Sequence, residues 1–451
     1  MADTVQPRTL PGFMELMPPE QQLFEKIKGI LEETYRSYGF FALDTPILEH
    51  SDILLAKAGG ETEKQIYRFS KGDTDLTMRF DLTVPLAKYV AMHQNELAFP
   101  FRRYQIGKVY RGERAQKGRY REFYQADIDV IGDGTLGIIN DAEIPSIICD
   151  IFRKLGIEGF TIRMNNRKVL NGIFEVYGVR DRATDVMRII DKLDKIGREK
   201  VIEELSGIGM YEARAGELLD FLALKLTNDE ILEKLGSLSG KSATLDEGTG
   251  ELSTLLKYAA LLGVPSENMR IDLTIARGLD YYTGTVYETI INSHPEIGSV
   301  CSGGRYDNLA EYYTSRKLPG VGMSIGLTRL FYVLDANDFI DRSFSSPADV
   351  LIIPMTDDVE GAVRLSVDLR SRGIRTQVYL EDKKFKQKMT YADRLGMPFV
   401  AILGEDEIAQ GKLSLKDMNS GEQILASPDE AAEKILSRIG ELSEAKVLHI
   451  D

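Results

Sequence analysis

The sequence predicts a multidomain α+β protein, in which a domain built on an antiparallel sheet carries an inserted helical module and a smaller α/β domain follows. Three observations support this prediction. The chain has 451 residues, more than one hydrophobic core usually supports. Strand-like runs bounded by turn residues dominate much of the chain, and a long helical stretch interrupts them. Towards the C-terminus, strand-like and helical runs alternate instead.

The N-terminal region predicts an amphipathic helix followed by an extended strand. Apolar residues recur at helical spacing over residues 19–37, and a Pro-Glu pair favours a helix start there. Gly39 is typical of a helix end. The segment 40–48 that follows is extended, and Pro46 within it cannot donate to a central ladder. We therefore expect an edge or interface strand.

The next elements predict a largely antiparallel sheet that carries helices. Strand-like runs with turn residues between several of them occupy residues 65–69, 75–80, 101–111, 123–131 and 161–164. Strand character returns after a helical interruption, at residues 269–275, 285–291 and 320–325, and a helix follows over 327–334. These segments are expected to form one domain over residues 1–335.

Two changes of sequence pattern set the other boundaries. Residues 169–262 place Ala, Glu, Leu, Lys and Ile at helical spacing, which predicts an inserted helical module. The polar stretch 336–347 is typical of a linker. Beyond it, residues 348–451 predict a parallel-rich α/β domain. Its expected strands are 349–354, 373–379 and 399–403, and its expected helices are 359–372 and 386–395.

Composition narrows the possible partners. The formal net charge of −14 argues against indiscriminate nucleic-acid binding, because phosphate contacts need clustered Lys and Arg. One local candidate is residues 382–388, where four lysines surround Phe385, although a solvated charged face explains the same pattern equally well. Apolar runs are shorter than the roughly 18 residues of a membrane span, and the N-terminus lacks a secretory pattern. We expect a cytoplasmic protein with no membrane partner.

Cysteine and histidine usage indicates no structural metal and no disulfide framework. Cys149 and Cys301 lie far apart and lack the spacing of a zinc site, so small core or pocket-wall positions are expected for both. The chain has four histidines, and none follows the H-x-x-x-H pattern. Any metal is therefore expected to arrive with a substrate.

The run 276–288 sets an arginine and two tyrosines among glycines within an otherwise strand-like segment. Arg277 precedes Gly278, where backbone can approach a ligand closely. In an extended segment Tyr281 and Tyr282 point to opposite faces, so one is expected to pack while the other lines a pocket. A packed hairpin whose arginine pairs with a structural carboxylate is the alternative.

The run 109–123 consists of two strand-like pieces joined by a basic loop. Arg111 and Arg119 offer planar forks of donors that suit phosphate oxygens. Phe123 offers an aromatic face, and stacking on a base is worth about 1–3 kcal/mol in single-stranded complexes. A salt-bridged surface hairpin is the alternative interpretation of this segment.

The run 320–329 predicts a strand that leads into a helix whose first turn carries Arg329. A helix N-terminus favours phosphate. The glycines do not match a dinucleotide-binding fingerprint, because the third arrives one residue late.

Together these runs resemble a known family. The run 276–288 resembles the signature peptide of histidyl-tRNA synthetases, and the runs 109–123 and 320–329 resemble the second and third signatures of class II aminoacyl-tRNA synthetases. The resemblance implies a class II catalytic domain over 1–335 and an anticodon-binding type of domain over 348–451. It implies an ATP-dependent, AMP-forming ligase that makes histidyl-adenylate and pyrophosphate from L-histidine, then transfers histidine to the 3′ end of tRNA(His).

The resemblance also assigns roles at the ATP end. Arg111 would hold the α-phosphate, Arg119 the outer phosphates and Arg329 the γ-phosphate. Glu113 would meet the adenine end or the tRNA terminus, and Phe123 would stack on adenine. Magnesium is expected with the ATP phosphates, and no organic cofactor is implied.

For the amino acid, the resemblance implies one catalytic arginine and a pocket for histidine. Arg277 would lie where the carboxylate meets the α-phosphate, and Arg111 would help it offset developing charge. Many bacterial members carry Glu at positions 81 and 129, whereas this chain carries the shorter Asp, so contacts through water are an alternative to direct ones. The implied histidine-binding residues are Asp81, Thr83, Gln125, Asp129, Arg277, Tyr281, Tyr282 and Tyr306.

Two other functions compete with this one. A non-catalytic, histidine-binding regulatory subunit of ATP phosphoribosyltransferase shares the catalytic fold. Such a subunit typically lacks the C-terminal domain and does not retain the arginines that bind ATP. A related synthetase for glycine, threonine or proline is disfavoured by the run 276–288. The resemblance further implies a homodimer formed through the N-terminal helix and the strand around Pro46.

Overall fold

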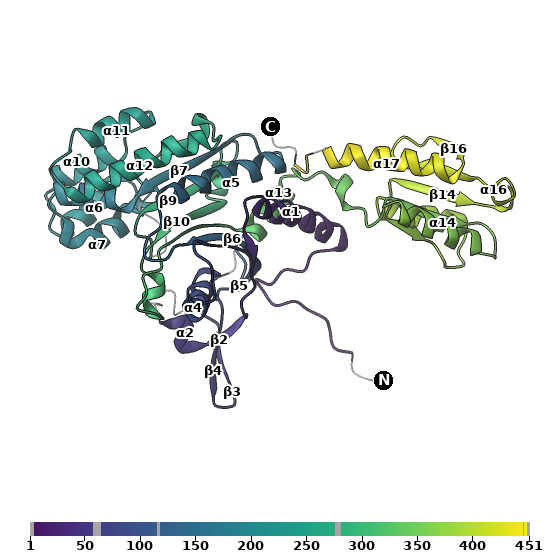
Figure 1. The fold of residues 1–451 in the computed structure, drawn as a ribbon, viewed down its shortest axis with the longest axis horizontal. Coiled ribbons are helices and arrows are strands. Elements are labelled where there is room, and N and C mark those ends of the chain that lie inside the picture. The colour runs from purple at the N-terminus through teal and green to yellow at the C-terminus, as the bar shows by residue number, and fades with distance from the viewer. Residues whose placement is uncertain (1–3, 57–64, 115–117, 276–280, 445, 449–451) are drawn as a thin grey trace. The chain divides into compact units, whose positions relative to one another are not determined.

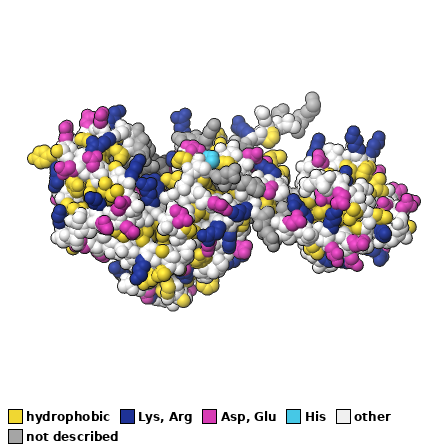
Figure 2. Space-filling view, turned by 90° about the horizontal axis from the view of Figure 1, so that it is seen from above, with side chains coloured by type: hydrophobic (Ala, Val, Ile, Leu, Met, Phe, Trp, Pro, Cys, Tyr) yellow, Lys and Arg dark blue, Asp and Glu magenta, His cyan; other side chains and the backbone are white. Residues whose placement is uncertain are grey.

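The computed structural model describes residues 4–56, 65–114, 118–275, 281–444 and 446–448 (Figure 1). The chain divides into two compact units. Of the described residues, 4–14 and those within 30–337 belong to the first, and 15–29 and those within 338–448 belong to the second. Among the described helices, none is long and apolar enough to cross a membrane. Acidic and basic side chains are interspersed over the face drawn in Figure 2.

An eight-stranded sheet forms the centre of the first unit. Its strand order is β1-β5-β6-β11-β10-β9-β7-β8. The pairs β1–β5 and β7–β8 are parallel, and the other five are antiparallel, which confirms the predicted largely antiparallel sheet. The strands are β1 (Phe41–Ala42), β5 (Phe101–Tyr110), β6 (Glu122–Ile131), β7 (Phe160–Asn166), β8 (Met269–Ile271), β9 (Thr285–Ile291), β10 (Cys301–Tyr306) and β11 (Gly320–Ile325).

Outside the region between β7 and β8, the longer described helices that belong wholly or partly to this unit are α1 (Pro18–Ser37), α4 (Thr83–His93), α5 (Ile139–Leu155) and α13 (Leu327–Ala336). The structure confirms the predicted helix 19–37 as α1. It adds α4 and α5, which the sequence did not predict. Helix α5 buries an apolar face that includes Ile147, Ile151 and Phe152, and it ends at Gly156, whose φ of 96° suits a residue without a Cβ.

The parallel neighbours β7 and β8 are joined by a region whose described elements are helical. Helices α6 and α12 pack closely against each other at Gly172, where the lack of a side chain makes room for Leu245. A Cβ at this position would lie 2.5 Å from Leu245. Local capping also fixes the helix starts, since Thr227 and Glu230 form a reciprocal capping box. The elements are α6 (Arg167–Val176), η1 (Arg180–Arg182), α7 (Ala183–Ile190), α8 (Leu193–Ile196), α9 (Arg198–Gly207), α10 (Glu212–Leu222), α11 (Asn228–Gly236) and α12 (Ala243–Leu261).

A separate three-stranded sheet corrects part of the sequence prediction. Strands β3 (Arg68–Lys71) and β4 (Thr74–Met78) pair with β2 (Leu48–His50) and not with the main sheet. The predicted strand 40–48 is divided between β1 and β2, which belong to different sheets. Pro46 lies between them, where the loss of an N–H donor breaks no ladder.

The second unit contains a five-stranded sheet of order β13-β12-β14-β15-β16. The expectation of a parallel-rich sheet was only half right, because β15 and β16 pair antiparallel. Its apolar core includes Val350, Ile352, Phe399 and Ile435. Its elements are β12 (Val350–Pro354), α14 (Glu360–Ser371), β13 (Thr376–Val378), α15 (Phe385–Arg394), β14 (Phe399–Leu403), α16 (Glu405–Ala409), β15 (Leu413–Asp417), β16 (Gln423–Ala426) and α17 (Pro428–Glu444).

Short helical segments complete the description: α2 (Ser51–Leu55), η2 (Ser266–Asn268), η3 (Pro295–Ile297), η4 (Leu309–Tyr312) and η5 (Arg342–Ser345). In the basic run 382–388, three of the four lysines are exposed. The fourth, Lys388, donates to the Pro354 carbonyl oxygen at 2.9 Å. An exposed basic run is compatible with both of its predicted interpretations.

Candidate active site

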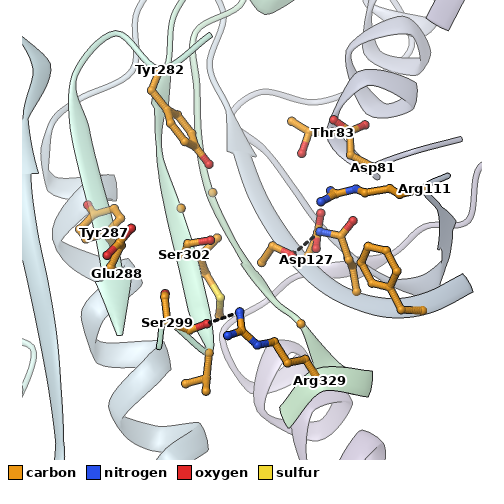
Figure 3. Close-up of a pocket in the computed structure, with 18 of the residues that line it drawn as sticks. Asp81, Thr83, Arg111, Asp127, Tyr282, Tyr287, Glu288, Ser299, Ser302 and Arg329 are labelled. Atoms are coloured by element: carbon orange, nitrogen blue, oxygen red, sulfur yellow. Dashed lines mark hydrogen bonds between the residues drawn. The ribbon is translucent and has the colours of Figure 1, made fainter. Parts of the chain in front are cut away.

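One cavity of about 510 Å³ lies on the eight-stranded sheet (Figure 3). Residues from β6, β9, β10 and β11 line it, together with the starts of α4 and α13 and the loop after β5. Arg277 lies outside the described residues. All the other residues predicted for the site line this cavity, namely Asp81, Thr83, Arg111, Glu113, Arg119, Phe123, Gln125, Asp129, Tyr281, Tyr282, Tyr306 and Arg329.

Strand β6 supplies a row of cavity residues because alternate side chains of a strand point to the same face. Phe123, Gln125, Asp127 and Asp129 all line the cavity. Asp127 was not among the predicted residues. The alternation alone could have identified it, since it lies midway between two residues that were predicted.

Arg111 and Phe123 form one end of the cavity. The Arg111 Nε donates to the Phe80 carbonyl oxygen at 3.0 Å, and its guanidinium carbon lies 5.2 Å from the centroid of the Phe123 ring. Figure 3 shows the Arg111 side chain directed into the cavity. The backbone therefore holds one edge of the guanidinium, which leaves its other edge available to an anion.

Arg329 comes from the first turn of α13 and is held by carbonyl oxygens. Its Nη1 donates to Ser299 at 3.3 Å, and its Nη2 donates to Ile297. Burial lowers the pKa of Arg329, and the positive charge of Arg119 lowers it further. Arg119 is more exposed, with its Nη1 at 3.9 Å from Glu113 Oε2. Two guanidinium groups thus face the same space, where an anion would relieve their repulsion.

Three buried carboxylates also line the cavity. Asp81, Asp127 and Asp129 are each no more than 3% exposed. Burial raises the pKa of Asp81, raises that of Asp127 to about 7 and raises that of Asp129 to about 6. Arg103 is fully buried beside them and opposes these shifts. One guanidinium is therefore shared by three acidic side chains.

The positions of these acids are set by specific contacts. Asp129 Oδ2 lies 2.7 Å from Arg103 Nη2, and Asp129 Oδ1 accepts from the Tyr306 hydroxyl at 2.5 Å. Asp81 Oδ1 accepts from the backbone N–H of Val84 at 3.0 Å, at the start of α4. The start of this helix thus fixes Asp81 at the cavity wall.

The tyrosine pair corrects a prediction. Tyr281 and Tyr282 both line the cavity, with ring centroids 5.0 Å apart in an edge contact, so they do not point to opposite faces. The alternation rule fails because the two residues lie in a turn before β9 and not in a strand. Tyr306 joins them, with its ring centroid 5.8 Å from that of Tyr281.

Glycines on β10 and β11 make room for the acids. A Cβ on Gly322 would lie 2.3 Å from Asp129 Oδ1, and a Cβ on Gly303 would lie 2.2 Å from the Gly322 carbonyl oxygen. The sequence predicted β11 but not β10, which contains Gly303 and Gly304. These glycines allow β10 and β11 to pair closely beside the cavity.

Sequence reasoning also missed a polar row that crosses four adjacent strands. Asp127 on β6 lies opposite Ser324 on β11, which lies opposite Ser302 on β10, which lies opposite Glu288 on β9. All four residues line the cavity. Gln125 Nε2 donates to Ser324 Oγ at 2.8 Å. The signal for this row was strand register, which becomes visible only once the strand order is known.

Comparison with known proteins agrees with this geometry. A model described as "Histidyl-tRNA synthetase" matches residues 12–330, and one described as "Anticodon binding domain" matches residues 349–438. The chain is 55% identical to a histidine–tRNA ligase of Clostridium tetani, over 95% of this chain and 98% of the relative. It is 49% identical to a histidine–tRNA ligase of Finegoldia magna, over 96% and 100%.

Solved structures give the same result. A histidyl-tRNA synthetase from Nostoc sp. superposes with a TM-score of 0.89 at 39% identity, covering 96% of this chain and all of that one. A Bacillus halodurans C protein titled as an ATP phosphoribosyltransferase regulatory subunit/histidyl-tRNA synthetase reaches a TM-score of 0.72 at 21% identity, over 86% and 97%, and shows the shared fold alone. The resemblance inferred from the motifs is therefore confirmed. This chain belongs to the histidyl-tRNA synthetase family.

Proposed function

We propose that this chain is a histidine–tRNA ligase that activates L-histidine with ATP and transfers it to the 3′ end of tRNA(His). One observation carries the proposal: a single cavity is lined by three arginines and an aromatic ring as well as by buried carboxylates and tyrosines. The arginines and the aromatic ring suit a nucleoside triphosphate. The carboxylates and tyrosines suit an amino acid with a basic, aromatic side chain.

At the nucleotide end, Arg111 holds the α-phosphate while Phe123 stacks on adenine. The short distance between the Arg111 guanidinium and the Phe123 ring supports this pairing of roles. Arg329 faces the γ-phosphate and Arg119 the outer phosphates, and Glu113 meets the adenine end or the tRNA terminus. Because carbonyl oxygens already orient Arg329, little rearrangement is needed when charge develops.

Magnesium enters this scheme with ATP. Within the described parts of the chain, no group of three or more His, Cys, Asp or Glu side chains is arranged to hold a metal ion. In the proposed scheme the metal is carried by the phosphate oxygens, where it would offset their negative charge. The protein's own contribution is then positioning of the two substrates and stabilisation by guanidinium groups.

At the amino-acid end, Asp81 and Thr83 meet the histidine amino group, and Gln125, Asp129, Tyr281, Tyr282 and Tyr306 complete the pocket. The contact between Asp129 and Tyr306 supports a relay in which the shorter aspartate orients a tyrosine hydroxyl at the ligand. Buried polar groups of this kind reject side chains that leave them unpaired. Arg277 and Arg111 then stabilise the pentavalent phosphorus as the histidine carboxylate attacks it.

The remaining partners follow from the family. The second unit is proposed to bind the anticodon region of tRNA(His), with the basic run 382–388 as a candidate contact, and tRNA charging places the activity in the cytoplasm. A homodimer through α1 and the segment around Pro46 is supported by β1, which lies at an edge of the large sheet and leaves Phe41 71% exposed. Light scattering on the purified chain checks the dimer.

The test of the proposed function is amino-acid-dependent exchange between ATP and pyrophosphate, followed by charging of tRNA(His). Histidine is expected to support exchange, and the other standard amino acids are not. A protein that binds histidine but shows no exchange would instead be a regulatory subunit. The comparisons do not favour that alternative. The two family models together match residues 12–330 and 349–438, and the Clostridium tetani histidine–tRNA ligase aligns with 95% of the chain.

A further inference from the structure

Four buried oxygen atoms of the described cavity residues accept no hydrogen bond, namely Asp81 Oδ2, Gln125 Oε1, Asp127 Oδ1 and Asp129 Oδ2. Asp129 Oδ2 is compensated by an ion pair with Arg103 Nη2 at 2.7 Å, which leaves three acceptors without a hydrogen bond or an ion pair. All three residues line the cavity. A buried acceptor without a partner is costly, so native proteins rarely keep one unless a water or ligand completes it.

The neighbouring acid differs in this respect. Both oxygens of Asp129 are already engaged, one by the Tyr306 hydroxyl at 2.5 Å and the other by the Arg103 guanidinium at 2.7 Å. Asp127 has the same strand, the same face and the same degree of burial. Of these two acids on β6, Asp127 is therefore the one with an oxygen available to a ligand.

The number of available acceptors identifies the group that they suit. An ammonium group carries three N–H donors and one positive charge. Three acceptors with two carboxylates among them match both the donors and the charge. An imidazole ring presents at most two N–H donors, which lie on opposite sides of the ring.

We propose that Asp127 is a further specificity-determining residue, which accepts a hydrogen bond from the α-ammonium group of the amino-acid substrate beside Asp81 and Gln125. This inference rests on the proposed function, because it assumes an amino-acid substrate in the cavity. Ser324 supports the arrangement. It lies opposite Asp127 in the strand register, and it accepts from Gln125 Nε2 at 2.8 Å, which turns Gln125 Oε1 away from the serine.

The experiment measures binding of three ligands by calorimetry to the full chain and to its Asp127→Asn variant. Histidine and histamine carry the ammonium group, whereas imidazolelactate has a hydroxyl in its place. Loss of one charged hydrogen bond is expected to weaken histidine and histamine at least about tenfold. Imidazolelactate should bind the two proteins within about twofold. ATP affinity should also be unchanged.

Two results would overturn the assignment. Equal weakening of all three ligands would mean that Asp127 contacts the ring, and unchanged histidine affinity would mean that it contacts no substrate. If the parent chain itself binds no histidine, the proposed function is wrong. If the parent binds histidine and only the variant departs from expectation, the assignment of Asp127 is wrong and the proposed function stands. Asp133→Asn, an exposed aspartate paired with Arg316, is the matched control and should leave all affinities unchanged. Should Asp127→Asn lose ATP binding, Asp127→Ser replaces it with the same expectation.

Discussion

The two large sheets of this molecule differ in what they bury. Strand β12 of the second unit buries five apolar residues in succession, Val350–Pro354. Strand β6 of the first unit buries its C-terminal half equally well, yet Asp127 and Asp129 are among the buried residues. Burying a carboxylate is unfavourable unless a partner compensates it.

The difference separates residues that stabilise from residues that bind. In the second unit, substitution of a buried side chain should change the free energy of unfolding and little else. On the cavity face of the first unit, substitution of a buried side chain should change ligand affinity. The bound ligand is expected to supply part of the interactions that stabilise the buried polar groups there. The predictions below test this division.

The largest expected effect is on stability in the second unit. Ile352→Ala removes a fully buried side chain from β12, an inner strand of the five-stranded sheet, and should lower the free energy of unfolding by about 2–5 kcal/mol. Hydrogen exchange of the β14 amides would report it. All the cavity residues belong to the first unit. Histidine-dependent exchange between ATP and pyrophosphate, measured at low temperature, should therefore be unchanged.

A matched control exists on the neighbouring helix. Val367 on α14 is 60% exposed, so Val367→Ala should alter stability by less than about 0.5 kcal/mol. A large fall in ATP–pyrophosphate exchange by Ile352→Ala, under conditions where the chain stays folded, would contradict the proposed division. It would mean that a buried residue of the second unit affects catalysis as well as stability.

The second prediction concerns the nucleotide end of the cavity. Arg111→Ala removes a preoriented donor and should reduce kcat for exchange by about 10²–10³-fold, with thermal stability close to that of the parent. Arg364→Ala, which removes an exposed arginine of the second unit, should have no effect on exchange. A loss below about tenfold would mean that Arg111 does not contact the reacting phosphate.

The fold of the sheet regions could largely be predicted from local pattern. Strand-like runs predicted β6, β9, β11 and β14, and helical spacing predicted α1 and α14. The exceptions have physical causes. Strand β10 contains Gly303 and Gly304, which carry no strand propensity, and only its pairing with β9 and β11 makes it a strand. The split of 40–48 between two sheets depends on partners that local sequence does not specify.

The candidate site was predicted through motifs, and its gaps follow from the same limit. Residues within the motifs, such as Arg111 and Arg329, converge on one cavity. Ser324 was missed because its place opposite Asp127 depends on register between strands distant in sequence, whereas Asp127 itself follows from the alternation along β6. The unusual tyrosine geometry was missed because a turn replaced the expected strand. Motifs thus gave the chemistry, while topology determined which further residues join it.

The third prediction tests the space reserved for the acids. Gly322→Ala would place a Cβ 2.3 Å from Asp129 Oδ1 and 2.4 Å from the Ile128 carbonyl oxygen, so the acid or the strand must move. Overpacking of this kind costs about 1–3 kcal/mol, and we expect histidine KM to rise at least about fivefold while ATP KM changes less. Gly250→Ala in α12, where a Cβ has open space, is the control and should stabilise the chain slightly.

A last expected effect is a pH dependence that arises from the same acids. Burial raises the pKa of Asp127 to about 7 and that of Asp129 to about 6, whereas unfolded aspartates ionise near 3.9. Between these values the folded chain binds more protons than the unfolded chain. Its stability without ligand should therefore fall as pH rises from about 4 to 7.

Histidine should reverse the sign of that dependence. A cationic ammonium group favours ionised carboxylates, so binding releases protons, and affinity should rise between pH 5.5 and 7.5 by up to about tenfold per pH unit for each proton released. The change in affinity is measured by the shift in melting temperature that histidine causes at pH 5.5 and at pH 7.5. Free histidine titrates near pH 6.5 in either case, so the reference is Asp127→Asn, in which the rise should be smaller. An identical rise in parent and variant would show that the pH dependence belongs to the ligand and not to the buried acid, and would leave β6 with a carboxylate that the cavity does not use.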